Sequence, residues 1–173
     1  MHLVWHRLQR FVASVFVAGL LAACAGPSPT PLPYKPPVGA TAGHWQGRLG
    51  VKILHPTPRS FNARFELDGD AQRGTLKLFT PLGTTLAQMR WAPGSATLTT
   101  TGEPQQFDSL AALSQATLGM DLPVLSLFDW LRGVSGTSGD WEVDLSALGD
   151  GKLGAKRRAP DLDAELKLIL ESD

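Results

Sequence analysis

Apolar and polar residues alternate along the chain from about His44, a pattern typical of strands that are buried on one face. In the first such stretch the apolar positions are Trp45, Gly47, Leu49, Val51 and Ile53. The same two-residue period returns in residues 61–67, 76–78, 85–91, 141–145 and 166–170, and further strands are expected in the threonine-rich residues 95–101 and in residues 152–158. Turn-forming residues separate the early stretches, so the pattern predicts an antiparallel meander with one apolar face.

Helical spacing replaces this alternation between residues 108 and 133. A first helix is predicted to begin at Asp108 as N-cap and to end at Gly119. Its expected buried positions are Leu110, Leu113, Ala116 and Thr117. For a second helix, Asp121 is the expected cap, Pro123 lies in the first turn and Gly133 ends it. Its apolar face comprises Val124, Leu127, Phe128 and Leu131.

The order of strands, two helices and further strands predicts an α+β fold, with the helices on one face of a curved antiparallel sheet. The apolar positions either fill a plain core or surround a cavity in a sheet too curved to fill itself. The candidate cavity-lining residues follow from the alternation and the helix faces: Trp45, Leu49, Val51, Phe61, Phe65, Leu76, Leu78, Met89, Trp91, Leu127, Phe128, Leu131, Trp141 and Val143.

The N-terminal segment has the parts of a secretory signal peptide. Arg7 and Arg10 precede a short apolar run, and the only cysteine, Cys24, stands just after it. The ending Leu21-Ala22-Ala23-Cys24 resembles the lipobox of bacterial lipoproteins, which implies cleavage before Cys24 and its acylation. The alternative is an ordinary signal peptide with an incidental thiol.

Residues 25–43 are rich in proline, which favours an extended tether. We therefore expect a lipoprotein signal peptide in residues 1–23, a lipidated cysteine and tether in 24–43, and one domain in 44–173.

Signal removal takes away two arginines and no acids, so 16 basic and 16 acidic residues become 14 and 16, a net charge of about −2. This balance argues against a nucleic-acid partner.

The sequence offers little support for an enzyme, a metal site or a cofactor. His44 and His55 do not stand at ligand spacing to another histidine or cysteine. The stretch around Ser135 resembles a nucleophile elbow but follows a predicted helix and ends in Thr137 instead of glycine. A periplasmic hydrolase that uses Ser135, His44 and His55 is kept as an alternative, which alanine substitutions would test.

Leu82 occupies the tip of the turn Thr80-Pro81-Leu82-Gly83, where a polar residue is the ordinary choice. On the residues alone, the expectation is that Leu82 folds back onto the core.

Several stretches, in order, resemble the LolB family of outer-membrane lipoprotein receptors of Gram-negative bacteria. They are residues 45–52 (WQGRLGVK), 79–86 (FTPLGTTL), 122–124 (LPV), 130–133 (WLRG) and 141–145 (WEVDL). Together they span most of the predicted domain. The resemblance implies an incomplete antiparallel β-barrel, with helices covering an apolar cavity.

The resemblance also implies a function. The cavity would accept the acyl chains of lipoproteins delivered by the periplasmic carrier LolA, and the protein would release this cargo into the outer membrane. A protruding loop of Pro81, Leu82 and Gly83 would serve membrane insertion, which reverses the expectation for Leu82. The implied protein is a lipid-anchored monomer that faces the periplasm and contacts phospholipid. The alternative is a structural, scaffolding outer-membrane lipoprotein that binds no acyl chains.

Overall fold

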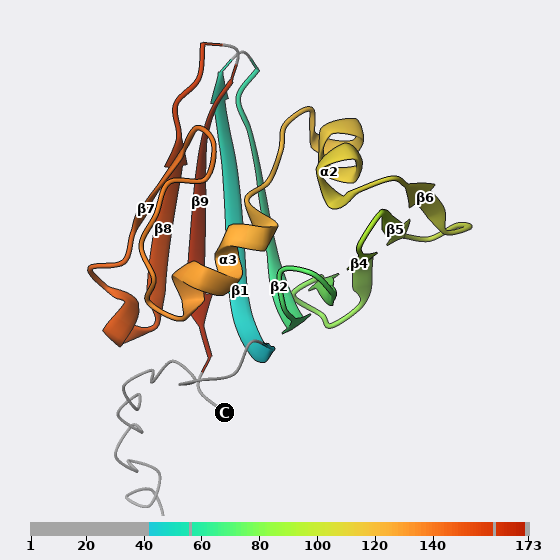
Figure 1. Cartoon of the computed structure of the whole chain (residues 1–173), viewed down its shortest axis with the longest axis horizontal. Coiled ribbons are helices and arrows are strands. Elements are labelled where there is room, and N and C mark those ends of the chain that lie inside the picture. Colours follow the sequence, from blue (N-terminus) through green and yellow to red (C-terminus); the bar gives the residue numbers. More distant parts are fainter. Residues whose placement is uncertain (1–41, 56, 161, 172–173) are drawn as a thin grey trace, which may run out of the picture. The chain divides into compact units, whose positions relative to one another are not determined.

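The computed structural model describes residues 42–55, 57–160 and 162–171, so Cys24 and nearly all of the tether lie outside the described residues. The described chain forms a nine-stranded sheet and two α-helices (Figure 1). Its strands are β1 (Gly43–His55), β2 (Arg59–Gly69), β3 (Gly74–Phe79), β4 (Thr85–Ala92), β5 (Ser95–Thr99), β6 (Gln105–Phe107), β7 (Trp141–Asp144), β8 (Lys152–Arg157) and β9 (Asp163–Leu170).

The sheet is antiparallel and open. Strands β1 to β6 each pair with the next strand along the chain, and β9 returns to pair with the other side of β1. The order is β6-β5-β4-β3-β2-β1-β9-β8-β7, which leaves β6 and β7 as edges. The structure thus confirms the predicted antiparallel sheet with two helices, arranged as an open, barrel-like α+β fold.

Gly47 permits the close pairing of β1 with β9. It lies opposite Leu170, and a Cβ atom at this position would stand 2.1 Å from the backbone oxygen of Ile169. Real Cβ atoms do not approach a backbone that closely, so a larger residue would force the two strands apart.

The predicted alternation places one face of the sheet in the core. On β1 the side chains of Trp45, Leu49, Val51 and Ile53 are buried, whereas those of Arg48 and Lys52 are exposed on the other face. The same inward pattern continues on the last strands, where Leu153, Leu166 and Leu168 are buried. Burial of this face supplies the hydrophobic stabilisation of the sheet.

Helix α2 (Leu110–Leu118) begins one residue later than the sequence predicts. Ser109, and not Asp108, is the N-cap, because its hydroxyl accepts a hydrogen bond of 3.0 Å from the backbone N–H of Ala112. The C-terminal prediction is confirmed, since Gly119 adopts the left-handed conformation at φ 72°.

The buried face of α2 also differs from the prediction. Leu110 and Leu113 are buried as expected, but Ala116 and Thr117 are exposed and Ser114 is buried. Ser114 can be buried because its hydroxyl has two acceptors within hydrogen-bonding distance, the backbone oxygen of Ala111 at 3.1 Å and the carboxylate of Asp121 at 3.2 Å. The hydrogen-bonding capacity of the hydroxyl is thus satisfied at a buried position where an apolar residue is the usual choice.

Helix α3 (Val124–Leu131) lies across the inner face of the sheet, in front of β1, β2 and β9 in Figure 1. The predicted face is confirmed, and Trp130 is buried as well. The predicted cap at Asp121 is wrong: the N-cap position is Pro123, which offers no side-chain acceptor. Two short elements escaped prediction, the edge strand β6 and the 3-10 helix η1 (Leu148–Asp150).

Candidate functional site

The loop between β3 and β4 is a tight hairpin turn held by three hydrogen bonds. The backbone N–H of Gly83 donates to the oxygen of Thr80 at 2.9 Å, and that of Thr80 donates to the oxygen of Thr84 at 2.8 Å. The hydroxyl of Thr80 also accepts from the N–H of Thr84 at 3.1 Å. Gly83 has φ 86°, as expected in a three-residue hairpin whose last loop residue is left-handed.

This geometry holds Leu82 away from the rest of the protein. Pro81 fixes the first loop dihedral, Gly83 takes the left-handed position, and Leu82 is left at the apex. Its side chain is 94% exposed, the largest value among the exposed large hydrophobic residues of the described chain. The sequence-based expectation that Leu82 folds back onto the core is therefore wrong, whereas a protruding apolar loop, implied by the family resemblance, matches this geometry.

Beneath α3 the structure brings most of the candidate cavity residues together. All except Phe61 and Val143 belong to one buried apolar cluster, and Val143 is half-buried against it. Phe128 of α3 is fully buried and makes aromatic contacts with Trp45 (ring centroids 5.6 Å apart) and Trp91 (6.0 Å). The helix and the sheet are thus joined through aromatic rings.

Three tryptophan indoles tie the cluster to backbone carbonyls around it. Each indole N–H donates to a backbone oxygen: Trp91 to that of Asp70 (3.2 Å), Trp130 to that of Gly136 (3.2 Å) and Trp141 to that of Asp121 (3.1 Å). These bonds satisfy the polar end of each buried ring and fix its orientation.

Phe61 lies near the open end of the same inner face and is 41% exposed. Strand β3 ends opposite Arg64, so the first residues of β2 have β1 on one side and no paired strand on the other. The lack of a neighbouring strand accounts for the exposure of Phe61, which sequence alternation alone cannot predict. Trp130, Leu166 and Leu168 are the converse: they are buried in the cluster although the candidate set omits them.

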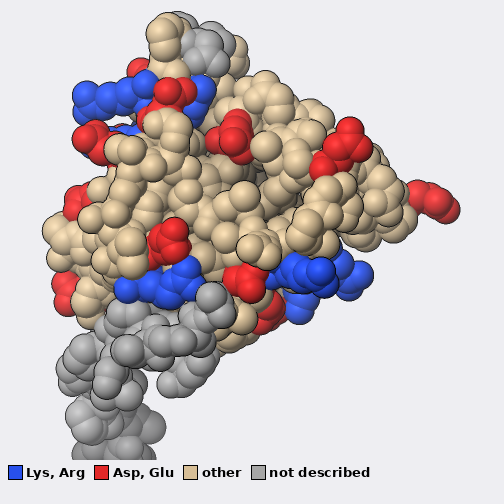
Figure 2. Space-filling model, in the orientation of Figure 1, with Lys and Arg blue, Asp and Glu red and all other residues tan. Residues whose placement is uncertain are grey.

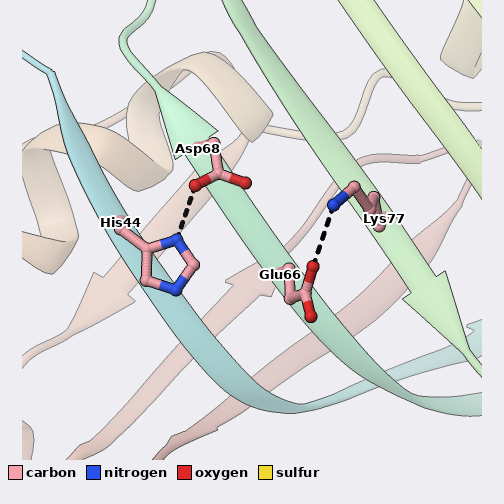
Figure 3. Close-up of polar contacts among 4 residues, drawn as sticks. All are labelled: His44, Glu66, Asp68 and Lys77. Atoms are coloured by element: carbon pink, nitrogen blue, oxygen red, sulfur yellow. Dashed lines mark hydrogen bonds and ion pairs between the residues drawn. The ribbon is translucent and has the colours of Figure 1, made fainter. Parts of the chain in front are cut away.

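Of the three residues of the hydrolase alternative, His44 and Ser135 have described side chains. His44 lies on the outer face of β1, where its Nδ1 is 2.5 Å from the carboxylate of Asp68, close to an ion pair of 3.1 Å between Lys77 and Glu66 (Figure 3). In this part of the sheet the partner of the histidine is therefore a carboxylate and not a nucleophile. Ser135 is exposed in the loop after α3, and the side chain of His55 is not described.

No group of His, Cys, Asp or Glu among the described residues is arranged to hold a metal ion. Within the same residues, no helix has the length and apolar character that crossing a membrane would require. Figure 2 shows that charged side chains on the α3 side of the molecule gather mainly toward its margins, with uncharged surface across much of the centre.

Comparison with known proteins decides the family. Residues 43–157 match the family model described as outer membrane lipoprotein LolB. The chain belongs to the LolB family. This confirms the predicted family, and the match covers every strand except β9, as well as both helices and the Leu82 loop.

Individual LolB relatives are moderately similar to the chain. The outer-membrane lipoprotein LolB of Bordetella petrii is 36% identical over 121 residues, which are 67% of this chain and 59% of the relative. That of Cupriavidus pinatubonensis is 30% identical over 66% of this chain and 56% of its own length. That of Chromobacterium violaceum is 28% identical over 78% and 74%. The chain thus spans less than two thirds of the length of the first two relatives. Their names agree with the predicted outer-membrane location and lipoprotein nature.

Proposed function

We propose that this LolB-family protein is an outer-membrane receptor that accepts lipoproteins from the periplasmic carrier LolA and inserts them into the membrane. The exposed Leu82, held at the tip of a rigid hairpin, is the observation that carries the proposal. A folded protein gains nothing from a leucine kept entirely in water, but an apolar side chain at that position can enter a lipid surface.

The apolar cluster under α3 is the proposed receiving site for acyl chains. Its side chains pack on one another in the described structure, so the proposal requires α3 to move away from the sheet when cargo enters. The sheet can allow such movement because it is open and one short helix covers much of its apolar face. Phe128 would be the first contact exchanged, since it joins α3 to Trp45 and Trp91.

Transfer would run downhill without a nucleotide. A gain of 1.4 kcal/mol in affinity over the carrier shifts the partition about tenfold. Burial of one or two additional methylene groups, at about 0.8 kcal/mol each, supplies that gain. The membrane must then bind the acyl chains more favourably than the receptor does. Leu82 would bring the domain into contact with the membrane.

The decisive experiment is transfer of a radiolabelled lipoprotein from its LolA complex to purified residues 25–173, with no membrane present. Transfer is the expected result and establishes an acceptor of higher acyl affinity than the donor. A folded domain that receives no cargo would contradict the receptor function, and a scaffolding lipoprotein would then explain the chain better.

A second measurement locates the acyl chains. A brominated fatty acid quenches tryptophan fluorescence only at short range, so occupancy of the cluster should quench Trp45 and Trp91. The Phe128→Ala variant, which enlarges the site, should bind the brominated fatty acid with a changed affinity. Because Trp130 and Trp141 belong to the same cluster, binding of the probe to the folded domain without any tryptophan quenching would place the acyl chain elsewhere.

We further propose that Cys24 carries the lipid anchor and that residues 25–43 form the tether. Incorporation of labelled palmitate into the chain, and its loss in Cys24→Ala, is the expected result. Labelling that survives Cys24→Ala would show that the anchor is attached elsewhere.

A further inference from the structure

A groove of about 870 Å³ lies on the outer face of the sheet, opposite the apolar cluster. Its sides are formed by outward-facing residues of β1, β2 and β9, and Pro81 of the Leu82 loop lies at its rim. Gly50, in the middle of β1, contributes backbone but no side chain to the floor of the groove. Gly50 lies between Asn62 on β2 and Lys167 on β9, so the groove runs between these two side chains.

Cations surround this floor. Arg48 and Lys52 flank Gly50 along β1, and Arg64 and Lys167 lie on the neighbouring strands. Two carboxylates also line the groove, Glu165 and Glu171, which leaves an excess of two positive charges. Glu171 pairs with Arg64 at 3.1 Å. Within the described residues, no carboxylate forms an ion pair with Arg48, Lys52 or Lys167.

The strand register places Lys52 opposite Glu165 of β9, but it also places one pair of like charges side by side. Arg48 lies directly opposite Arg64 in the β1–β2 pair, and like charges in that position destabilise a sheet. On its other side Arg48 lies opposite Ile169 of β9, an apolar side chain that is 48% exposed in the groove. An anionic group with an apolar portion would complement both features.

The register also places the groove beside the Leu82 loop. Phe79, the last residue of β3, lies opposite Arg64, and the hairpin loop begins at the next residue. Strands β1 and β2 continue past this point, so Asn62 and Gly50 lie in the next row along the sheet. A surface that receives Leu82 would therefore meet the cationic groove on the same side of the molecule.

We propose that this groove binds the phosphate-bearing headgroup of an anionic membrane phospholipid while the Leu82 side chain enters the apolar layer. Charge complementarity, the shared rim at Pro81 and the exposed Ile169 favour a lipid over a purely polar ligand. The headgroup site goes beyond the receptor function and does not depend on cargo transfer. It would orient the protein on the membrane, with the outer face of β1 toward the headgroups.

Vesicle binding of residues 24–173 with Cys24→Ala tests the site without attached acyl groups and without the apolar run of residues 11–23. The vesicles contain phosphatidylcholine either alone or with 30 mol% phosphatidylglycerol, and binding is measured by co-sedimentation. Arg48→Gln with Lys167→Gln removes two groove cations. Arg73→Gln with Arg90→Gln is the matched control, because both residues are exposed and neither lines the groove.

The groove variant should bind phosphatidylglycerol vesicles roughly 30-fold more weakly, from about 1 kcal/mol for each cation near an anionic surface. The control variant should lose less than threefold, and binding to pure phosphatidylcholine should be similar for both. Equal losses in the two variants would mean diffuse charge attraction and would overturn the proposal. Unchanged binding of the groove variant, as expected if the groove faces an acidic protein, would also overturn it.

Gly50→Thr tests the shape of the groove with its charge unchanged. An added Cβ would lie 2.9 Å from Oδ1 of Asn62, the end of an exposed side chain that can move away, so the strand should still form. We expect about tenfold weaker binding to phosphatidylglycerol vesicles with an unchanged urea midpoint. Full binding by a folded Gly50→Thr protein would exclude a headgroup in the groove.

Membrane-free transfer from LolA should be normal in all these variants. A failure of the headgroup proposal is therefore distinguishable from a failure of the receptor function.

Discussion

A turn lies at each end of β3, and the two turns differ in the character of their side chains: one is polar and the other carries an exposed leucine. In the β2–β3 turn the carboxylate of Asp70 accepts hydrogen bonds from the backbone N–H groups of Gln72 (2.7 Å) and Arg73 (2.9 Å). In the β3–β4 turn Thr80 accepts a similar bond from Thr84, but the apex is Leu82. Both turns are satisfied by polar groups at their bases. The leucine therefore adds nothing to turn formation, which indicates a role outside the fold.

The largest expected effect comes from Leu82→Glu. Delivery of cargo into liposomes should fall at least tenfold, because insertion of a leucine into an apolar layer is worth about 1.5–3 kcal/mol and a carboxylate opposes it. Acceptance of cargo from LolA should be unchanged. Delivery and acceptance are measured separately, with and without liposomes.

Ala71→Glu is the matched control, since it adds the same charge at an exposed position of the opposite turn. It should deliver cargo normally. If Leu82→Glu loses acceptance while its urea midpoint is normal, Leu82 belongs to the receiving step and not to insertion.

A double variant exchanges the character of the two turns. Leu82→Ser removes the apolar apex, and Ala71→Leu creates one at the other end of β3. Delivery should remain reduced, by several-fold, because the new leucine lies at the wrong end of the strand. Recovery to the wild-type rate would show that any exposed leucine suffices and that its position has no importance.

Sequence reasoning predicted the backbone of this loop better than the position of its side chain. Pro81 and Gly83 indicate a turn from their dihedral preferences alone. Whether Leu82 packs or protrudes depends on what lies near the apex, which only the three-dimensional arrangement of β3 and β4 determines. The family resemblance supplied the protruding loop that local chemistry did not.

The same limit applies to the core and the helix caps. Alternation placed Trp45 and Leu49 on the buried face because a strand has a strict two-residue period. It could not predict the exposure of Phe61, which follows from the early end of β3. Ser109 and Asp108 are both good capping residues, so composition alone could not choose between adjacent positions.

Gly83→Ala tests whether the Leu82 loop is as rigid as its hydrogen bonds indicate. Its φ of 86° is unfavourable for alanine, whereas no atom lies within 4 Å of the added Cβ. The free energy of unfolding should therefore fall by about 1 kcal/mol from backbone strain alone. Gly102→Ala is the control, because that exposed glycine is also free of close contacts but has no positive φ. A loop that adapts freely would show equal, negligible changes in both variants.

The smallest expected effect concerns the polar turn and depends on pH. Hydrogen bonds from the backbone N–H groups of Arg73 and Gln72 lower the pKa of Asp70 below its ordinary value of 3.8. The ionised carboxylate therefore stabilises the fold above the unfolded-state pKa, and this contribution disappears as the pH falls through the lower folded-state pKa. Asp70→Asn keeps an acceptor oxygen but loses the charge, so its melting temperature should be slightly lower than that of the wild type at pH 7. Below pH 3.8 the two melting temperatures should converge.

Asp108→Asn, at an exposed position outside the turn, should match the wild type throughout. A difference between Asp70→Asn and wild type that persists at low pH would show that the amide changes the turn geometry and not only its charge.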